Sequence, residues 1–154
     1  MHREHPLPLC HTSAWAIDKI QSYLSSAVIP IRLACNDRDG FPLVCSLWYL
    51  YRDGYFWCAV HKNSKVCKLL SYNAKCAFEV ASNEMPYKGV RGQGVVSLLH
   101  DEAGIVLPNL IDRYLAEKNQ KLRNWLLSRV DQELAIRIEP TWLTSWDFSA
   151  RMSG

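Results

Sequence analysis

The pattern of apolar and polar residues along the chain predicts strands joined by short turns, with helices inserted between them. Residues 55 to 60 form a nearly continuous apolar run after the turn Arg52-Asp53-Gly54, which is typical of a buried strand. From Val66 to Leu70 the apolar residues recur at the spacing of a helix with one buried face. We therefore expect a strand that ends in a polar turn and continues into a helix, which should stop near Asn73.

The rest of the chain follows the same pattern. One helix is expected after a cap at Ser13, and two more lie between residues 103 and 130. Tight turns join the first three expected strands, which predicts an antiparallel meander. The expected strands are residues 28–35, 42–51, 55–60, 75–82, 90–99, 133–139 and a last one after Pro140. This order predicts an α+β fold in a single domain of 154 residues, a six- to seven-stranded antiparallel β-barrel with peripheral helices.

Composition and charge exclude several classes of protein. Hydrophobic residues make up 49% and charged residues 21% of the chain, which is typical of a globular domain rather than a disordered one. The formal net charge of +3 and the lack of a dense basic run do not indicate a nucleic-acid partner. No apolar stretch approaches the roughly 20 residues that span a bilayer, and the N-terminus lacks the pattern of a signal peptide. We expect no membrane partner.

The cysteines predict a cytoplasmic protein. Their spacing includes no CxxC pair and no zinc-site pattern, and four of the six fall in expected strands, where a free thiol acts as a small apolar side chain. Buried, reduced thiols favour a reducing compartment. The six are Cys10, Cys35, Cys45, Cys58, Cys67 and Cys76. A metal site formed by His2, His5, Cys10 and His11 is conceivable, but we expect residues 1 to 12 to be a loose arm and the chain to hold no metal.

The turn between residues 60 and 66 has the composition of a phosphate site. Asn63 or Ser64 can cap the helix that follows, and Lys65 lies just inside it. A helix start has unpaired N–H groups and the positive end of the helix dipole, both of which attract phosphate. The alternative is that the turn only caps a helix and that Lys65 is a solvated charge.

Four segments in this order resemble the pyridoxamine 5'-phosphate oxidase-like flavoproteins, whose FMN-binding domain is a split β-barrel. Together they span about residues 28 to 150, and their order and spacing carry the resemblance. The segments are Gly40-Phe41-Pro42 with the following strand and Asp53-Gly54; the helix start Ser64 to Leu69 with Asn73-Ala74-Lys75-Cys76-Ala77-Phe78; Pro86 to Gly94; and Ile136 to Pro140 with Ser145-Trp146-Asp147-Phe148.

The resemblance implies a homodimer with a flavin between its subunits. Its phosphate would be held by Ser64 and Lys65, with Asn63 as a further candidate. The isoalloxazine edge would meet Cys45, Ser46, Leu47 and Trp48 of one strand and Ala59 and Val60 of another. The partner subunit would contribute Lys88, Arg91 and Trp146.

The resemblance has departures. Many relatives carry an arginine where this chain has Ser64, and the arginine-histidine cluster of true pyridoxamine 5'-phosphate oxidases is missing after Trp146, which argues against vitamin B6 oxidation. A deazaflavin is therefore an alternative to FMN.

Several functions remain open from the residues. The chain is expected to be an FMN-dependent oxidoreductase acting on an unidentified small molecule, and the alternatives are a non-catalytic flavin-binding or storage protein and a deazaflavin-dependent reductase. Haem binding through His2, His5 or His11 and a hydrolase built on Cys58 and His61 are weaker alternatives. No catalytic residue stands out.

Overall fold

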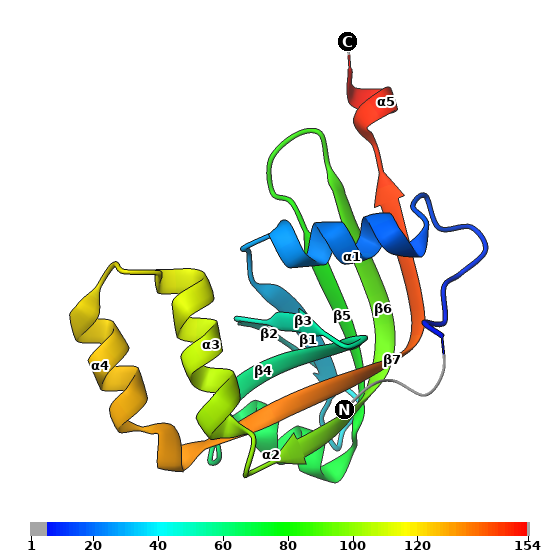
Figure 1. The fold of residues 1–154 in the computed structure, drawn as a ribbon. Helices are drawn as coiled ribbons and strands as arrows, with labels where there is room; N and C mark the ends of the chain where they lie inside the picture. The colour runs from blue at the N-terminus through cyan, green and yellow to red at the C-terminus, as the bar shows by residue number, and fades with distance from the viewer. Residues whose placement is uncertain (1–5, 154) are drawn as a thin grey trace.

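The computed structural model describes residues 6–153, in which seven strands form one antiparallel sheet in the order β2-β1-β5-β6-β7-β4-β3 (Figure 1). The sheet curls into a barrel with helices outside it, as the sequence predicts. The strands are β1 (Ile31–Asn36), β2 (Pro42–Leu47), β3 (Leu50–Arg52), β4 (Tyr55–His61), β5 (Lys75–Ala81), β6 (Lys88–Leu99) and β7 (Glu133–Asp147). The helices are α1 (Ile17–Ser26), α2 (Lys65–Tyr72), α3 (Ala103–Leu115), α4 (Gln120–Ser128) and α5 (Ser149–Met152), and a short 3₁₀ turn covers Val130–Gln132.

The barrel closes through the link between β2 and β3. These strands lie at opposite edges of the sheet, yet only Trp48 and Tyr49 separate them, so the two edges must come together. The sequence predicted one strand over residues 42–51, and this was wrong. Tyr49 interrupts it, because its hydroxyl donates to the carbonyls of Leu24 (2.8 Å) and Ala27 (2.9 Å) and its buried ring is fixed against α1. The predicted meander is therefore divided: β2 pairs with β1, and β3 pairs with β4.

A single strand, β7, runs through Pro140, where the sequence predicted two. Pro140 lies opposite Gly94, next to a register shift between Gln93 and Gly94, and such an irregularity tolerates the missing N–H of proline. At Gly92 a β-carbon would lie 2.3 Å from the carbonyl oxygen of Trp142. The glycines of β6 thus mark a bend where two backbones approach closely. A bend or a close approach is a common reason for glycine inside a strand.

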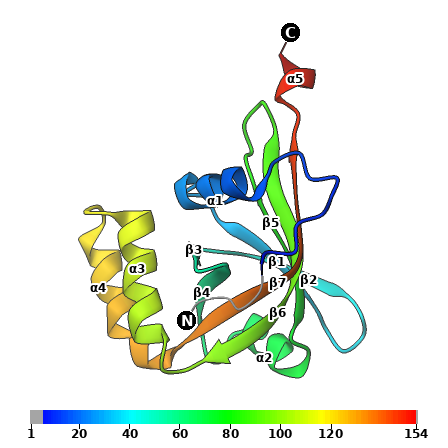
Figure 2. The same ribbon diagram turned by 45° about the vertical axis from the view of Figure 1, so that its right-hand side comes forward.

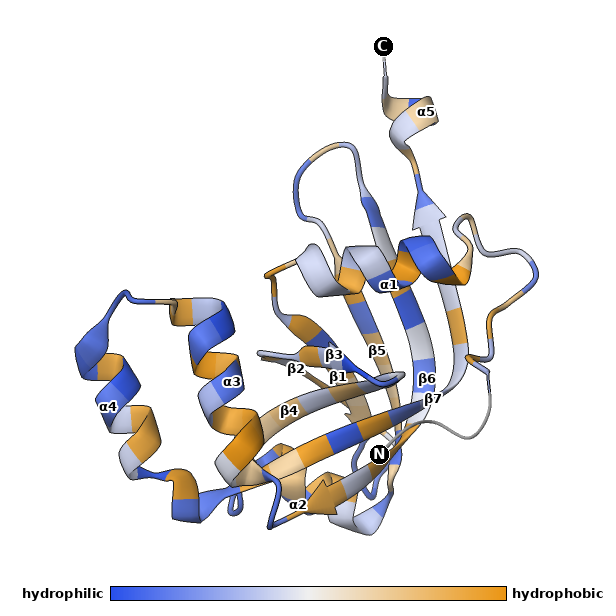
Figure 3. Cartoon of the chain, viewed as in Figure 1, coloured by the Kyte–Doolittle hydropathy of each residue, from blue (hydrophilic) through white to orange (hydrophobic). Residues whose placement is uncertain are grey.

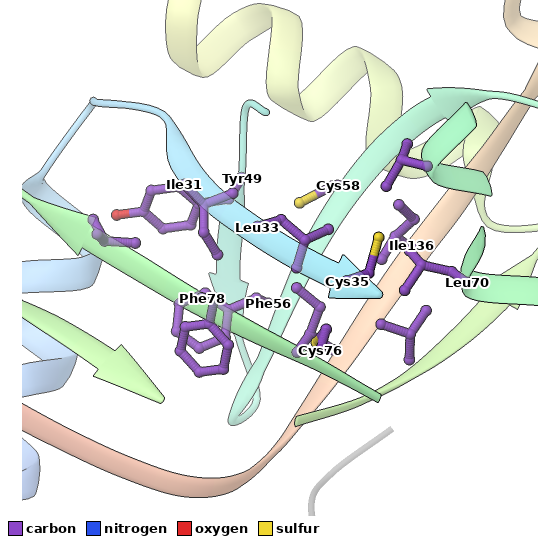
Figure 4. Packing of buried hydrophobic residues seen from close by; sticks show 14 of the residues in the cluster. Ile31, Leu33, Cys35, Tyr49, Phe56, Cys58, Leu70, Cys76, Phe78 and Ile136 are labelled. Atoms are coloured by element: carbon purple, nitrogen blue, oxygen red, sulfur yellow. The ribbon is translucent and has the colours of Figure 1, made fainter. Parts of the chain in front are cut away.

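The barrel interior holds the main core. The inward residues of five strands and of α1 and α2 fill it, among them Leu33, Phe56, Phe78 and Ile136 (Figure 4). Figures 1 and 2 show α1 across the upper part of the barrel and α2 at its lower end. A second, smaller core lies outside the barrel, where the apolar side of α3 covers β4 and β7 (Figure 3).

The N-terminal segment is tied to β7. The expected cap at Ser13 was wrong: α1 begins at Ile17, and the Ser13 hydroxyl instead bonds to Trp15 O and lies 2.8 Å from the Ser145 hydroxyl. Residues 8 to 10 are not loose either. The amide of Cys10 donates to Leu143 (2.7 Å) and the amide of Leu143 donates to Pro8 (3.0 Å).

The N-terminal segment can attach to β7 because β7 is longer than its partner β4. It continues past Ile138, the last residue of β7 that pairs with β4. The backbone edge of β7 beyond Ile138 is covered by the N-terminal segment.

His2 and His5 lie outside the described residues. None of the described helices has the length and apolar character needed to cross a membrane.

Burial of Tyr49 predicts a loss of stability at alkaline pH. Burial is the main cause that raises the pKa of this phenol above its usual value of about 10. Below about pH 10 the Tyr49 phenol is neutral in the folded and in the unfolded protein. Above it the phenol ionises only in the unfolded protein, so the free energy of unfolding should fall as pH rises. We expect Tyr49→Phe to reduce the fall by up to about 1.4 kcal/mol per pH unit above pH 10, measured by urea unfolding. Tyr72→Phe, at an exposed position, is the matched control and should leave the slope unchanged.

Candidate functional site

The turn that is predicted to hold a phosphate lies where β4 passes into α2. Ser64 is the cap, because its hydroxyl accepts from the amide of Cys67 (3.2 Å). Asn63 is not: its own amide donates to His61 Nδ1 (3.1 Å). Lys65 is the first residue of α2 and is exposed.

Two amides at this helix start are left without a hydrogen bond among the residues that the structure describes. The amides of Cys67 and Lys68 both bond to Ser64, through its hydroxyl and its carbonyl respectively. Within the described part of the chain, the amides of Lys65 and Val66 make no such bond. Together with the Lys65 ammonium and the dipole of α2, they form a set of donors that suits a phosphate group.

A split in the barrel adjoins this corner. The ladder between β3 and β4 stops at Leu50 and Trp57, so residues 58 to 61 pair only with β7 among the described strands. In the same way β2 pairs only with β1. β2 and β4 therefore diverge from Trp48 and Tyr49, and each has one backbone edge unpaired. Helix α2 begins just after the end of β4, beside this split. Such edges offer N–H and C=O groups to the polar rim of a flat ligand.

The side chains predicted around the ring system take three positions. Cys45, Leu47 and Val60 pack in the barrel core, so only their backbone can face the split. Ser46 points outward, opposite Arg32. Trp48 and Ala59 belong to the smaller core, and the Trp48 ring stacks on that of Tyr114 with centroids 5.0 Å apart.

The residues predicted for the partner subunit lie together near the start of β6 and the end of β7. Lys88 pairs with Asp147 and its neighbour Gly89 with Trp146, and the Arg91 guanidinium lies 5.3 Å from the centroid of the Trp146 ring. The amide of Val96, eight residues further along β6, bonds to Ala74 just beyond α2. At about 3.3 Å per residue, Lys88 is roughly 26 Å from that point. Lys88 therefore lies far from α2 within one chain. Arg91, by contrast, is in one row of the sheet with Ser46, because Ser46 lies opposite Arg32, Arg32 opposite Glu79, and Glu79 opposite Arg91.

Sequence reasoning missed the outer face of the sheet. Two shallow cavities of about 580 and 410 Å³ lie over β2, β1, β5, β6 and β7 and share Ala34, Ala77 and Gln93. Apolar side chains are exposed on these strands, Val44 at 64%, Val95 at 42% and Trp142 at 37%. These apolar residues lie among charged ones, such as Arg32, Glu79 and Arg91, and exposed apolar side chains gathered on one face are typical of an interaction surface. The alternation within each expected strand contained this information, but only the strand order brings the residues together.

The structure disfavours a Cys58–His61 hydrolase. Cys58 is fully buried in the core (Figure 4), and burial raises the pKa of its thiol far above the range of a nucleophile. His61 Nδ1 is already engaged with the Asn63 amide. Among the described residues, no group of three or more His, Cys, Asp or Glu side chains could hold a metal ion.

Comparisons with known proteins identify the fold. No protein-family model matches the chain, and no curated protein matches it significantly. Among solved structures, a conserved hypothetical protein of Mycobacterium tuberculosis superposes with a TM-score of 0.77 at 19% identity, covering 90% of this chain and 89% of its own. An F420 reductase gives 0.68 at 19% identity (80% and 94% covered), and an FAD-binding protein of Mesorhizobium loti gives 0.64 at 20% identity (85% and 94% covered).

Proposed function

From the split-barrel fold that this chain shares with the pyridoxamine 5'-phosphate oxidase-like proteins, we propose that it is an FMN-binding oxidoreductase that works as a homodimer in the cytoplasm. The observation that carries the proposal is the corner between β4 and α2. There two free amides, the start of a helix and Lys65 converge beside the split between β2 and β4.

The chain's own residues would hold the flavin by its phosphate and by the rim of its ring. The Lys65 ammonium and the amides of Lys65 and Val66 would bind the phosphate, with the Ser64 hydroxyl keeping the helix start in place. The free backbone edges of β2, at residues 45 to 47, and of β4, at residues 59 and 60, would donate to and accept from the ring. Hydride and electron transfer would be supplied by the bound flavin itself.

A second copy of the chain would complete the site. Lys88 lies roughly 26 Å along β6 from Val96, which bonds just beyond the end of α2, and Trp146 lies beside it on β7. A second copy would bring these residues to a phosphate held at Lys65. The outer sheet face, with Val44, Val95 and other exposed apolar residues, supports packing against such a copy. Two-fold symmetry would then bring each end of one sheet beside the opposite end of the other.

A deazaflavin is the second candidate. It is favoured by the similarity to a protein named as an F420 reductase and by Ser64, which replaces an arginine expected in many FMN-binding relatives. The same corner would hold its phosphate, so the two cofactors differ in ring chemistry rather than in anchor.

Titration of the purified protein with FMN, riboflavin and coenzyme F420 tests the proposal. We expect FMN to bind at one molecule per subunit of a dimer, with bleaching by NADPH or NADH and recovery when an acceptor is added. Binding of FMN without bleaching would indicate a non-catalytic flavin-storage protein. Tighter binding of F420 than of FMN would establish the deazaflavin alternative. Absence of binding by all three compounds would refute the proposed cofactor site.

A further inference from the structure

Two buried cysteines face each other directly across neighbouring strands. Cys35 of β1 and Cys76 of β5 are partners in the antiparallel register, and residues directly opposite share one face of the sheet. Both side chains point into the barrel core, where they are 3% and 7% exposed. Figure 4 shows them in one cluster with Cys58.

We propose that Cys35 and Cys76 form an oxidisable dithiol, which closes to a disulfide between β1 and β5 when the protein meets a peroxide. One thiolate would attack the peroxide and become a sulfenic acid, with release of water from hydrogen peroxide. The second thiol would then displace water from that sulfur to form the S–S bond. In total two S–H bonds are lost, and the peroxide takes up the two electrons and two protons to give two waters.

The spacing of paired strands suits this bond. The α-carbons of directly opposite residues are about 4.5 to 5.5 Å apart, within the range of about 4.4 to 6.8 Å that disulfides span. Their β-carbons, at about 4.5 to 5.5 Å, need to approach by up to about 1 Å. The position of the pair allows this movement, because Cys35 and Cys76 are the last residues joined in the β1–β5 ladder.

No other cysteine lies directly opposite either of these two, although burial raises the pKa of the Cys58 thiol and Cys45 and Cys76 are near enough for each to add to that rise. Cys45 lies opposite Leu33, and Leu43 lies opposite Cys35, so Cys45 and Cys35 are only diagonal neighbours. Diagonal β-carbons are about 7 to 8 Å apart, well beyond the roughly 4 Å of a disulfide. Cys58 is on β4, which shares no ladder with β1 or β5.

The two thiols are also near enough to influence each other. Burial raises the pKa of Cys76 to about 12, and the neighbouring Cys35 adds to that rise. Burial also raises the pKa of the Cys35 thiol. Few thiolates are therefore present at neutral pH, and oxidation will depend on opening of this end of the ladder, a slow step compared with reaction of an exposed cysteine.

Peptide mapping after oxidation tests the pairing. The protein is treated with hydrogen peroxide, unfolded in the presence of an alkylating agent so that buried thiols are capped as well, and digested with trypsin without reduction. Cleavage at lysine and arginine places Cys35 in residues 33–38 and Cys76 in residues 76–88, and each other cysteine in a separate peptide. We expect the main cross-linked species to join these two peptides, with the mass of two hydrogen atoms lost and recovery on reduction.

Variants separate this pair from chance oxidation. Cys35→Ser and Cys76→Ser should each abolish the cross-linked species, whereas Cys58→Ser, also in the core, should retain it. The wild-type map decides the matter even if a variant fails to fold. A main disulfide between any other two cysteines, or full alkylation of both Cys35 and Cys76 after oxidation, would overturn the proposal.

Discussion

Replacing Lys65 with alanine should weaken FMN binding by about 10- to 100-fold. A hydrogen bond between charged partners contributes about 1.5 to 3 kcal/mol, which corresponds to that range of dissociation constants. Lys65 is the exposed first residue of α2, and its ammonium can reach a phosphate bound at the two free amides without loss of a buried contact. Fluorescence titration with FMN at constant ionic strength gives the dissociation constants.

Riboflavin makes this experiment specific, because it has the same ring system without the phosphate. Lys65→Ala should leave riboflavin affinity unchanged while it lowers that of FMN. Lys121→Ala removes the same charge from the exposed surface of α4 and should change neither. Equal FMN affinity in Lys65→Ala and wild type would remove Lys65 from the site, and an equal loss for both ligands would indicate a folding defect instead.

Replacing Gly92 with alanine should destabilise the protein by about 3 kcal/mol, the upper part of the usual range for overpacking. The added β-carbon would lie 2.3 Å from the carbonyl oxygen of Trp142 and 2.8 Å from the Phe78 ring. The oxygen belongs to the backbone of β7, so β6 and β7 would have to move apart, and a side-chain rotation cannot relieve the contact. Denaturant unfolding of the flavin-free protein measures the change.

Gly104 provides the matched control for this substitution. A β-carbon there would meet no atom within 4 Å, and the residue lies in the first turn of α3. Gly104→Ala should therefore be neutral or stabilise the protein by about 0.5 kcal/mol, because alanine is the better helix former. If Gly92→Ala were no less stable than Gly104→Ala, the close approach of β6 and β7 would be wrong.

The sequence predicted those elements whose cause is local. The apolar run at residues 55 to 60, a cap at Asn63 or Ser64 and the stop at Asn73 all depend on near neighbours, and the structure confirms them, with Ser64 as the cap. The break at Tyr49 could not be predicted, since it depends on hydrogen bonds to Leu24 in a distant helix and to Ala27 just beyond its end. The attachment of residues 8 to 10 likewise depends on how far β7 outruns β4.

The candidate site was predictable to the same extent. The turn and helix start at Ser64 and Lys65 are local features that the structure contains. Their role in holding a phosphate stays a prediction. The side chains of Cys45, Leu47 and Val60 face the core, so only their backbone could meet a ligand in the split, a division that depends on how the barrel closes. The outer sheet face required the strand order, which brings together residues from five strands.

A crystal structure of the protein grown with FMN tests the central claim most directly. We expect the phosphate at the amides of Lys65 and Val66, within hydrogen-bond distance of the Lys65 ammonium, and the ring in the split between β2 and β4. Lys88, Arg91 or Trp146 of the partner subunit should border it. A flavin bound elsewhere, or a Lys65 corner that faces bulk solvent away from any second chain, would contradict this account.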